Sequence, residues 1–181
     1  MSTVEVVNVV GSGSLGIEVD LYAVDADLGA ETNYDPDEHT GLHIRLESGA
    51  LVTIYRTGSY HIVGVDSNEA LTAARNEFLG LLGEIGLEAP VGEDPFSVRN
   101  LVATTDIGRS VNLNALSIGL GLEKVEYEPE QFPGLVYRPE EMSAVVLIFS
   151  SGKLVVTGIR SVEDAETARE SVVSEIQHLL S

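Results

Sequence analysis

Residues 145–158 read VVLIFSSGKLVVTG, and this stretch decides the fold. Two apolar runs, 145–149 and 154–156, are joined by a tight Ser151-Gly152 connection, which predicts an antiparallel hairpin. A hairpin strand with one wet face alternates apolar and polar residues, but neither run alternates. Such strands are either fully buried in a sandwich or carry an exposed apolar face that binds a partner. The pattern alone leaves both interpretations open.

A related hairpin occurs earlier in the chain and reveals an internal repeat. Gly58 and Gly64 match Gly152 and Gly158 at an offset of 94 residues, and residues 6–10 match residues 98–102 at an offset of 92. Because the matches extend over most of both halves, we predict two tandem repeats, residues 1–90 and residues 91–181. A short segment that contains Pro and Gly, residues 88–95, joins them.

Each copy has the same predicted order of elements. A β-rich run (4–10; 96–103) precedes a short helix (19–28; 111–120), a strand (41–46; 134–138), the hairpin (50–56 with 60–65; 144–150 with 153–158) and a long helix. In the second copy, Ser161 and Asp164 fit a capping box at the start of the long helix. Strands and helices are segregated within each copy, so the fold class is α+β, with roughly five strands per copy. Two helices can cover only one face of such a sheet.

Composition narrows the classes of protein. The chain has 181 residues, 29 of them acidic and 10 basic, which gives a formal charge of −19. It has no cysteine, which excludes disulfides, thiolate metal sites and cysteine nucleophiles. No apolar run approaches the roughly 20 residues that span a bilayer, and residues 1–15 lack the basic head of a secretory signal. We expect a cytoplasmic protein with no membrane contact, and the acidity indicates either a halophilic cytoplasm or ordinary solubility charge.

Two motifs of the second repeat resemble a known family. Residues 126–138, EYEPEQFPGLVYR, and residues 147–158, LIFSSGKLVVTG, look like the second repeat of the TATA-box-binding protein family, with the closest likeness to its archaeal, haloarchaeal-like members. The resemblance covers nearly the whole chain and is weaker in the first repeat. It implies a saddle, in which the two repeats form a curved antiparallel sheet of about ten strands, with about four helices on the convex face and DNA under the concave face.

The resemblance also implies which residues contact DNA. It implies wedging aromatics at Phe132 and Phe149, base-edge contacts from Asn8 and Asn100, phosphate contacts from Arg45, Arg138 and Lys153, and groove-lining residues Val10, Val102, Leu147, Val155 and Thr157, with Pro133 on the same surface. Without the resemblance, the two phenylalanines would be interpreted as core aromatics and Asn100 as a turn or capping residue.

The first repeat departs from this pattern on the same surface. His39, Tyr55, His61 and Val63 stand where the second repeat has Phe132, Phe149, Val155 and Thr157, and Thr53 stands at the position of Leu147. Histidine and tyrosine can stack on bases, but each carries a polar group that needs a partner once it is buried. The sequence therefore predicts weaker or asymmetric TATA binding, with the DNA bend supplied mainly by the second repeat.

Three competing signals point to other chemistry. Residues 11–16 read GSGSLG, a dinucleotide-binding fingerprint with Glu31 near the distance of the ribose-binding acid, but the repeat counterpart at 103–108 keeps only the last glycine. His39 and His43 have the i, i+4 spacing that a metal site uses on a helix. The intervening Gly41 disfavours a helix here. The acids at 123–130 lack the loop glycine of an EF-hand and are better interpreted as a solvated, protein-docking edge. We expect no catalysis, no cofactor and no metal.

The sequence therefore predicts an archaeal general transcription initiation factor. By resemblance, it binds and bends TATA-box promoter DNA through the minor groove and recruits transcription factor B and, indirectly, RNA polymerase. The alternative is a divergent paralogue with weakened TATA recognition that acts as a promoter-selective or regulatory factor through protein contacts. Whether free molecules form a homodimer through their DNA-binding faces stays open.

Overall fold

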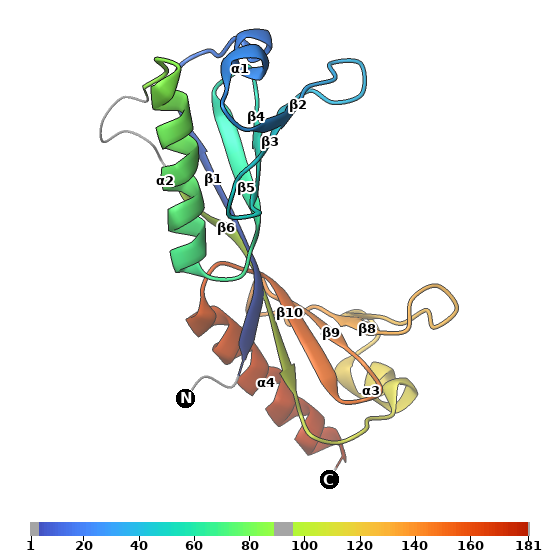
Figure 1. Cartoon of the computed structure of the whole chain (residues 1–181). Helices are drawn as coiled ribbons and strands as arrows, with labels where there is room; N and C mark the ends of the chain where they lie inside the picture. The colour runs from blue at the N-terminus through green and yellow to red at the C-terminus, as the bar shows by residue number, and fades with distance from the viewer. Residues whose placement is uncertain (1–3, 89–95, 181) are drawn as a thin grey trace. The chain divides into compact units, whose positions relative to one another are not determined.

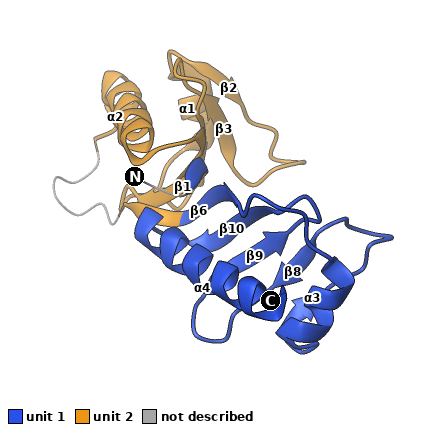
Figure 2. Cartoon of the chain, turned by 90° about the horizontal axis from the view of Figure 1, so that it is seen from below, with its two compact units in different colours: residues 1–7, 100–181 blue, residues 8–99 orange. Residues whose placement is uncertain are grey.

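The computed structural model describes residues 4–88 and 96–180, and this part of the chain contains ten strands and four helices. Two compact units are formed, one from residues 1–7 with 100–181 (unit 1) and one from residues 8–99 (unit 2) (Figure 2). The strand order of the sheet is β2-β3-β4-β5-β1-β6-β10-β9-β8-β7. The expected α+β class, with two repeats, about ten antiparallel strands and about four helices, is confirmed.

Unit 2 contains the elements of the first repeat. They are β1 (Glu5–Ser14, shared with unit 1), α1 (Leu21–Asp27), β2 (Glu31–Asn33), β3 (Leu42–Arg45), β4 (Leu51–Ile54), β5 (Ser59–Val65) and α2 (Asn68–Glu84) (Figure 1). The strands pair antiparallel in the order β2-β3-β4-β5-β1. Side-chain caps begin the helices, since Asp20 accepts hydrogen bonds from the first turn of α1 and Ser67 accepts one from the first turn of α2.

Unit 1 repeats this arrangement with the second half of the chain. Its elements are β6 (Ser97–Asp106, shared with unit 2), α3 (Leu113–Leu120), β7 (Val125–Glu126), β8 (Leu135–Tyr137), β9 (Val145–Ile148), β10 (Lys153–Ile159) and α4 (Val162–Leu180). The strand order is β6-β10-β9-β8-β7. The Ser161 half of the capping box predicted for α4 is present, because the backbone N–H of Asp164 donates to the Ser161 hydroxyl at 3.1 Å.

Burial alternates along the strands that the sequence left ambiguous. In β9 and β10 the side chains of Val146, Ile148, Leu154 and Val156 are fully buried, whereas Val145, Leu147 and Val155 between them are half-exposed. Helix α4 packs against β10 and contributes its own buried stripe, Ala165, Ala168, Val172 and Ile176 (Figure 1). One face of the sheet is therefore the helix-covered core, and the other is apolar but partly open. This observation selects the exposed apolar face over the buried sandwich strand.

Several element boundaries differ from the sequence expectation. Strand β1 continues through residues 11–14, because these residues pair with residues 59–62 of β5. Gly11 faces the core, where a Cβ would lie within 3.0 Å of Leu71 and Phe96. Strands β2 and β7 were not located from sequence, since two or three residues are too few to show a period. The expected linker at 88–95 lies almost wholly outside the described residues.

The same hairpin contact occurs in both repeats. The carbonyl of Gly58 accepts from Leu15 at 2.9 Å, and the carbonyl of Gly152 accepts from Ile107 at 3.0 Å. Both glycines have positive φ, 88° and 95°, and a Cβ at either position would lie about 2 Å from a backbone oxygen, that of Ile17 or Arg109. Each hairpin turn is thus packed against the segment that leads into the first helix of its repeat.

We expect Gly152→Ala to destabilise the protein by about 3 kcal/mol or more, because it adds an unrelievable backbone clash to the positive-φ strain. Gly49→Ala is the matched control, since Gly49 has φ of 93° and open space around its Cβ position; it should cost only about 1 kcal/mol. Denaturant unfolding in concentrated KCl measures both, and equal losses would contradict the packing argument.

Candidate nucleic-acid interface

The open face of unit 1 is an apolar surface with few polar atoms. It is formed by alternate residues of four strands and by the residue that follows β9, namely Asn100, Val102, Val136, Leu147, Val155, Thr157 and Phe149. Strand register places Val136, Leu147 and Val155 directly side by side, as a row across β8, β9 and β10. A hollow of about 780 Å³ beside this row is lined by Phe149, Lys153 and Val155, among others. We call these seven residues the open face of unit 1.

An aromatic pair ends this face. The rings of Phe132 and Phe149 meet edge to face with their centroids 5.9 Å apart, and Phe132 is 39% exposed. Gly134 makes the approach possible, because a Cβ there would lie 2.8 Å from Phe132 and 3.0 Å from Phe149. A turn at Glu128, whose carbonyl accepts from Gln131 and Phe132, positions the loop. The two rings are thus presented at the surface rather than enclosed in the core.

Asn100 is held in a defined orientation by β10. Its side-chain oxygen accepts from the backbone N–H of Gly158 at 3.0 Å, and its amide nitrogen donates to the Thr157 hydroxyl at 3.3 Å. The Asn100 side chain therefore links β6 to β10 by hydrogen bonds and does not cap a helix or a turn. One amide hydrogen is left to donate outward from the open face.

The open face of unit 2 has the same geometry and a different chemistry. Its residues are Asn8, Val10, His43, Thr53, Tyr55, His61 and Val63. His43, Thr53 and His61 lie side by side across β3, β4 and β5. Rings are paired at both ends of this row. The ring centroids of His39 and His43 are 5.1 Å apart, and those of Tyr55 and His61 are 5.7 Å apart.

The residues proposed from sequence fall on these two faces or at their rims. Half-buried on the faces are Asn8, Val10, Tyr55, His61, Val63, Asn100, Val102, Leu147, Phe149, Val155 and Thr157, and exposed at the rims are His39, Arg45, Phe132, Pro133, Arg138 and Lys153. Sequence reasoning missed His43 as a member of the open face of unit 2 and Val136 as a member of the open face of unit 1. The repeat offset of 93 that relates Gly41 to Gly134 also relates these two positions and could have found them.

The comparisons with known proteins agree with this geometry. The family model "Transcription factor TFIID (or TATA-binding protein, TBP)" matches residues 3–85 and 95–179. The chain is 50% identical over 180 residues to TATA-box-binding protein C of Halobacterium salinarum, covering 98% of this chain and 99% of that protein. It is 46% identical to TATA-box-binding protein 2 of Haloferax volcanii, covering 98% and 95%. The chain belongs to the TATA-binding protein family. Its members are transcription factors and not enzymes.

A solved member of the TATA-binding protein family supports the fold over the whole chain. The Methanococcus jannaschii TBP structure superposes with a TM-score of 0.85 at 37% identity, covering 97% of this chain and 98% of that one. The pseudo-repeat found in the sequence is therefore the repeat of this family.

Two of the three rim cations of this TATA-binding protein homologue, Arg138 and Arg45, already have partners. Arg138 pairs with Glu126 at 2.9 Å, and Arg45 donates to the carbonyl of Gly49 at 3.0 Å. Both side chains are exposed. Such exposed pairs contribute little to stability and exchange readily, so either cation can turn to a phosphate.

The competing signals do not form sites. Residues 11–14 lie inside β1 and cannot form the phosphate-binding turn of a dinucleotide fold. Within residues 4–88 and 96–180, no three His, Asp or Glu side chains are arranged to hold a metal ion. No helix in this part of the chain is long and apolar enough to cross a membrane.

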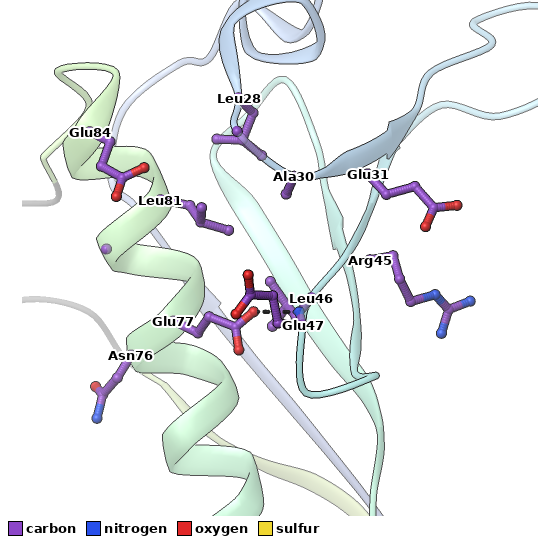
Figure 3. Close-up of a pocket in the computed structure, with 12 residues that line it drawn as sticks. Leu28, Ala30, Glu31, Arg45, Leu46, Glu47, Asn76, Glu77, Leu81 and Glu84 are labelled. Atoms are coloured by element: carbon purple, nitrogen blue, oxygen red, sulfur yellow. Dashed lines mark hydrogen bonds between the residues drawn. The ribbon is translucent and has the colours of Figure 1, made fainter.

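A groove of about 810 Å³ lies elsewhere, beside helix α2 of unit 2 (Figure 3). Four carboxylates line it, those of Glu31, Glu47, Glu77 and Glu84. Glu77 uses one carboxylate oxygen to accept the backbone N–H of Glu47 at 2.8 Å, so it fixes the β3–β4 turn against the helix. The groove belongs to the packing of α2 and contains none of the open-face residues.

The pKa of His61 is lowered from 6.5 by burial and then by the neighbouring His43. The folded state therefore holds the neutral imidazole more strongly than the unfolded chain does. As the pH falls through 6.5 toward the lowered value, the unfolded state binds the proton first, so the free energy of unfolding decreases.

We expect the thermal unfolding midpoint to decrease as the pH is lowered from about 7.5 to about 5.5. Most carboxylates titrate below this range. His61→Val should reduce this fall, which thermal unfolding at constant salt measures in both proteins. An identical fall in the variant would show that other groups are responsible.

Proposed function

We propose that this protein is an archaeal general transcription initiation factor that binds TATA-box promoter DNA in the minor groove and bends it. The observation that carries the proposal is the open apolar face of unit 1 with the Phe132–Phe149 pair at its end. A surface of this kind is costly in water unless a partner covers it. The proposed partner is a widened minor groove, whose sugars and base edges suit apolar side chains.

Wedging explains the exposed aromatic pair. Proteins of this family, like other minor-groove binders, insert apolar side chains between base steps, at a cost of a few kcal/mol per step that is offset by wider contact. Phe149 lies at the end of the face, with Phe132 beside it and exposed, so one ring is available to enter a step while the other supports it. Asn100 would donate its remaining amide hydrogen to a base-edge acceptor near the centre of the site.

The acidity fits binding at high salt. A charge of −19 repels DNA at low ionic strength, but the screening length falls to about 3 Å at 1 M salt. Apolar contact and short-range hydrogen bonds then remain as the attractive terms. The proposed setting is therefore a halophilic cytoplasm, with the protein on the nucleoid, and relatives from Halobacterium salinarum and Haloferax volcanii support it.

We propose that unit 1 supplies most of the bend. Tyr55 and His39 replace the two phenylalanines in unit 2, and their rings pair with His61 and His43 rather than with each other. Within residues 4–88 and 96–180, the rings of His39 and Tyr55 form no pair like that of Phe132 and Phe149 in unit 1.

Phe149→Ala should therefore lower affinity for a TATA duplex by about tenfold and abolish the kink at one end. Tyr55→Ala, the matched change in unit 2, should have a smaller effect on the bend. Energy transfer between dyes on the two DNA ends, in molar KCl, measures both. Equal losses of bend in the two variants would contradict the asymmetry.

We further propose that the protein recruits transcription factor B and, through it, RNA polymerase. Glu126 at the end of β7 and Glu128 and Glu130 in the loop that follows are exposed and offer a polar docking edge. The second candidate, a promoter-selective paralogue, is favoured by one observation, the polar side chains of His43, Thr53 and His61 side by side on unit 2.

Gel shift on TATA and scrambled duplexes, with and without transcription factor B, separates the two functions. A general factor should bind TATA DNA alone and form a larger complex with the partner. Binding only in the presence of the partner, or with no preference between the duplexes, would favour the paralogue. Glu128→Lys should weaken the larger complex several-fold and leave DNA binding by the protein alone unchanged.

A further inference from the structure

Two rows of three residues occupy the same place on the two open faces. In unit 1 the apolar row is Val136, Leu147 and Val155, joined by strand register. In unit 2 the polar row is His43, Thr53 and His61, joined by the same register. Each position of one row is the repeat counterpart of a position in the other. The backbone is therefore held constant while hydrogen-bonding side chains replace hydrocarbon at all three places.

The polar row is firmly positioned. Thr53 is only 6% exposed, because it is flanked by both histidines and because Gly41 lies against its methyl group, where a Cβ would approach within 2.6 Å. Tilted ring contacts with His39 and Tyr55 restrict the two imidazoles from the sides. His43 and His61 remain half-exposed. The groups that a ligand meets on this part of unit 2 are therefore imidazoles in fixed places.

Imidazole nitrogens offer what the apolar row lacks. A neutral imidazole has one donor and one acceptor nitrogen. In the described part of the chain, no hydrogen bond occupies the ring nitrogens of His43 or His61. The lowered pKa of His61 keeps that ring neutral near pH 7, which preserves its acceptor.

The minor groove distinguishes base pairs by one donor. A·T and T·A pairs present only acceptors there, whereas a G·C pair adds the 2-amino group of guanine. Against Val136, Leu147 and Val155 that amino group would be buried without a partner, which is unfavourable. Against His43 and His61 it meets an acceptor.

We propose that the polar row makes unit 2 accept a G·C pair in its half of the DNA site, while the apolar row restricts the half under unit 1 to A·T pairs. The ligand is thus an asymmetric promoter element, and His43 and His61 determine specificity by accepting a hydrogen bond from the guanine 2-amino group. This inference rests on the proposed DNA-binding function.

Base analogues isolate the 2-amino group. Inosine·C has the minor-groove pattern of A·T, and 2,6-diaminopurine·T has that of G·C, so the amino group can be added or removed without changing the rest of the groove. One A·T duplex and two duplexes with a single 2,6-diaminopurine, one in each half, would be titrated in molar KCl. Because the chain has no cysteine, Asn114→Cys on α3 gives one dye site, which reports which half unit 1 occupies.

We expect the added amino group to weaken binding about tenfold under unit 1 and to leave it unchanged or stronger under unit 2. In the double variant His43→Val/His61→Val, the penalty should become similar in the two halves. The matched control is His178→Val, which changes an exposed histidine on α4 that belongs to neither open face and should leave the asymmetry unchanged. Circular dichroism and the unfolding midpoint show whether each variant is folded, and Val155→His in unit 1 provides a converse test by relieving the penalty there.

Two results would overturn the inference. Equal penalties in the two halves for the wild-type protein would show that the polar row does not sense the amino group. An unchanged asymmetry in the folded double variant would assign it to other residues. Failure of the proposed function is recognised separately, because the A·T duplex itself would then not bind.

Discussion

The arrangement of every functional residue depends on the burial of one sheet face beneath two helices in each unit. Along β9 and β10, alternate side chains are fully buried, and the intervening ones are left half-exposed. Because successive strand residues point to opposite faces, this core fixes which residues belong to the open face. A register slip of one residue would exchange the two sets, so the core indirectly specifies the proposed DNA-binding surface.

The repeats differ most where packing constrains them least. Gly58 and Gly152 occupy the same turn, with positive φ and the same close approach to a backbone oxygen. His61 and Val155 occupy the same strand position and share no chemistry. Packing therefore accounts for what the two halves have in common, and it does not require what distinguishes them. This difference supports the proposal that the polar row on unit 2 takes part in ligand recognition.

Charge and surface chemistry are consistent with each other. The rim arginines are exposed and engaged in exchangeable contacts, while the centre of the unit 1 face is hydrocarbon. A surface of this composition gains little from long-range electrostatic attraction to DNA. Its binding would depend on direct apolar contact with the opened minor groove. This dependence suits an ionic strength at which long-range attraction is screened in any case.

Much of this protein could be predicted from its sequence. The repeat, the α+β class, the hairpins around Gly58 and Gly152 and the helix cap at Ser161 all depend on local chemistry, because turns, caps and periodicity are encoded within a few residues. The family resemblance rested on two motifs of the second repeat and is confirmed over the whole chain. The residue roles carried over from it remain proposals.

Tertiary structure decided what local sequence left open. The run at 145–149 looked equally suited to a buried strand and to an exposed apolar face, because its residues are apolar on both sides; only the position of the helices separates the two. His43, Thr53 and His61 are ten and eight positions apart along the chain and become neighbours only through strand pairing. From sequence alone, Gly11 is compatible with a phosphate-binding loop. In the structure it packs against Leu71 and Phe96, which are distant in sequence. In each case, long-range contacts determined the environment of a residue that its sequence neighbours could not specify.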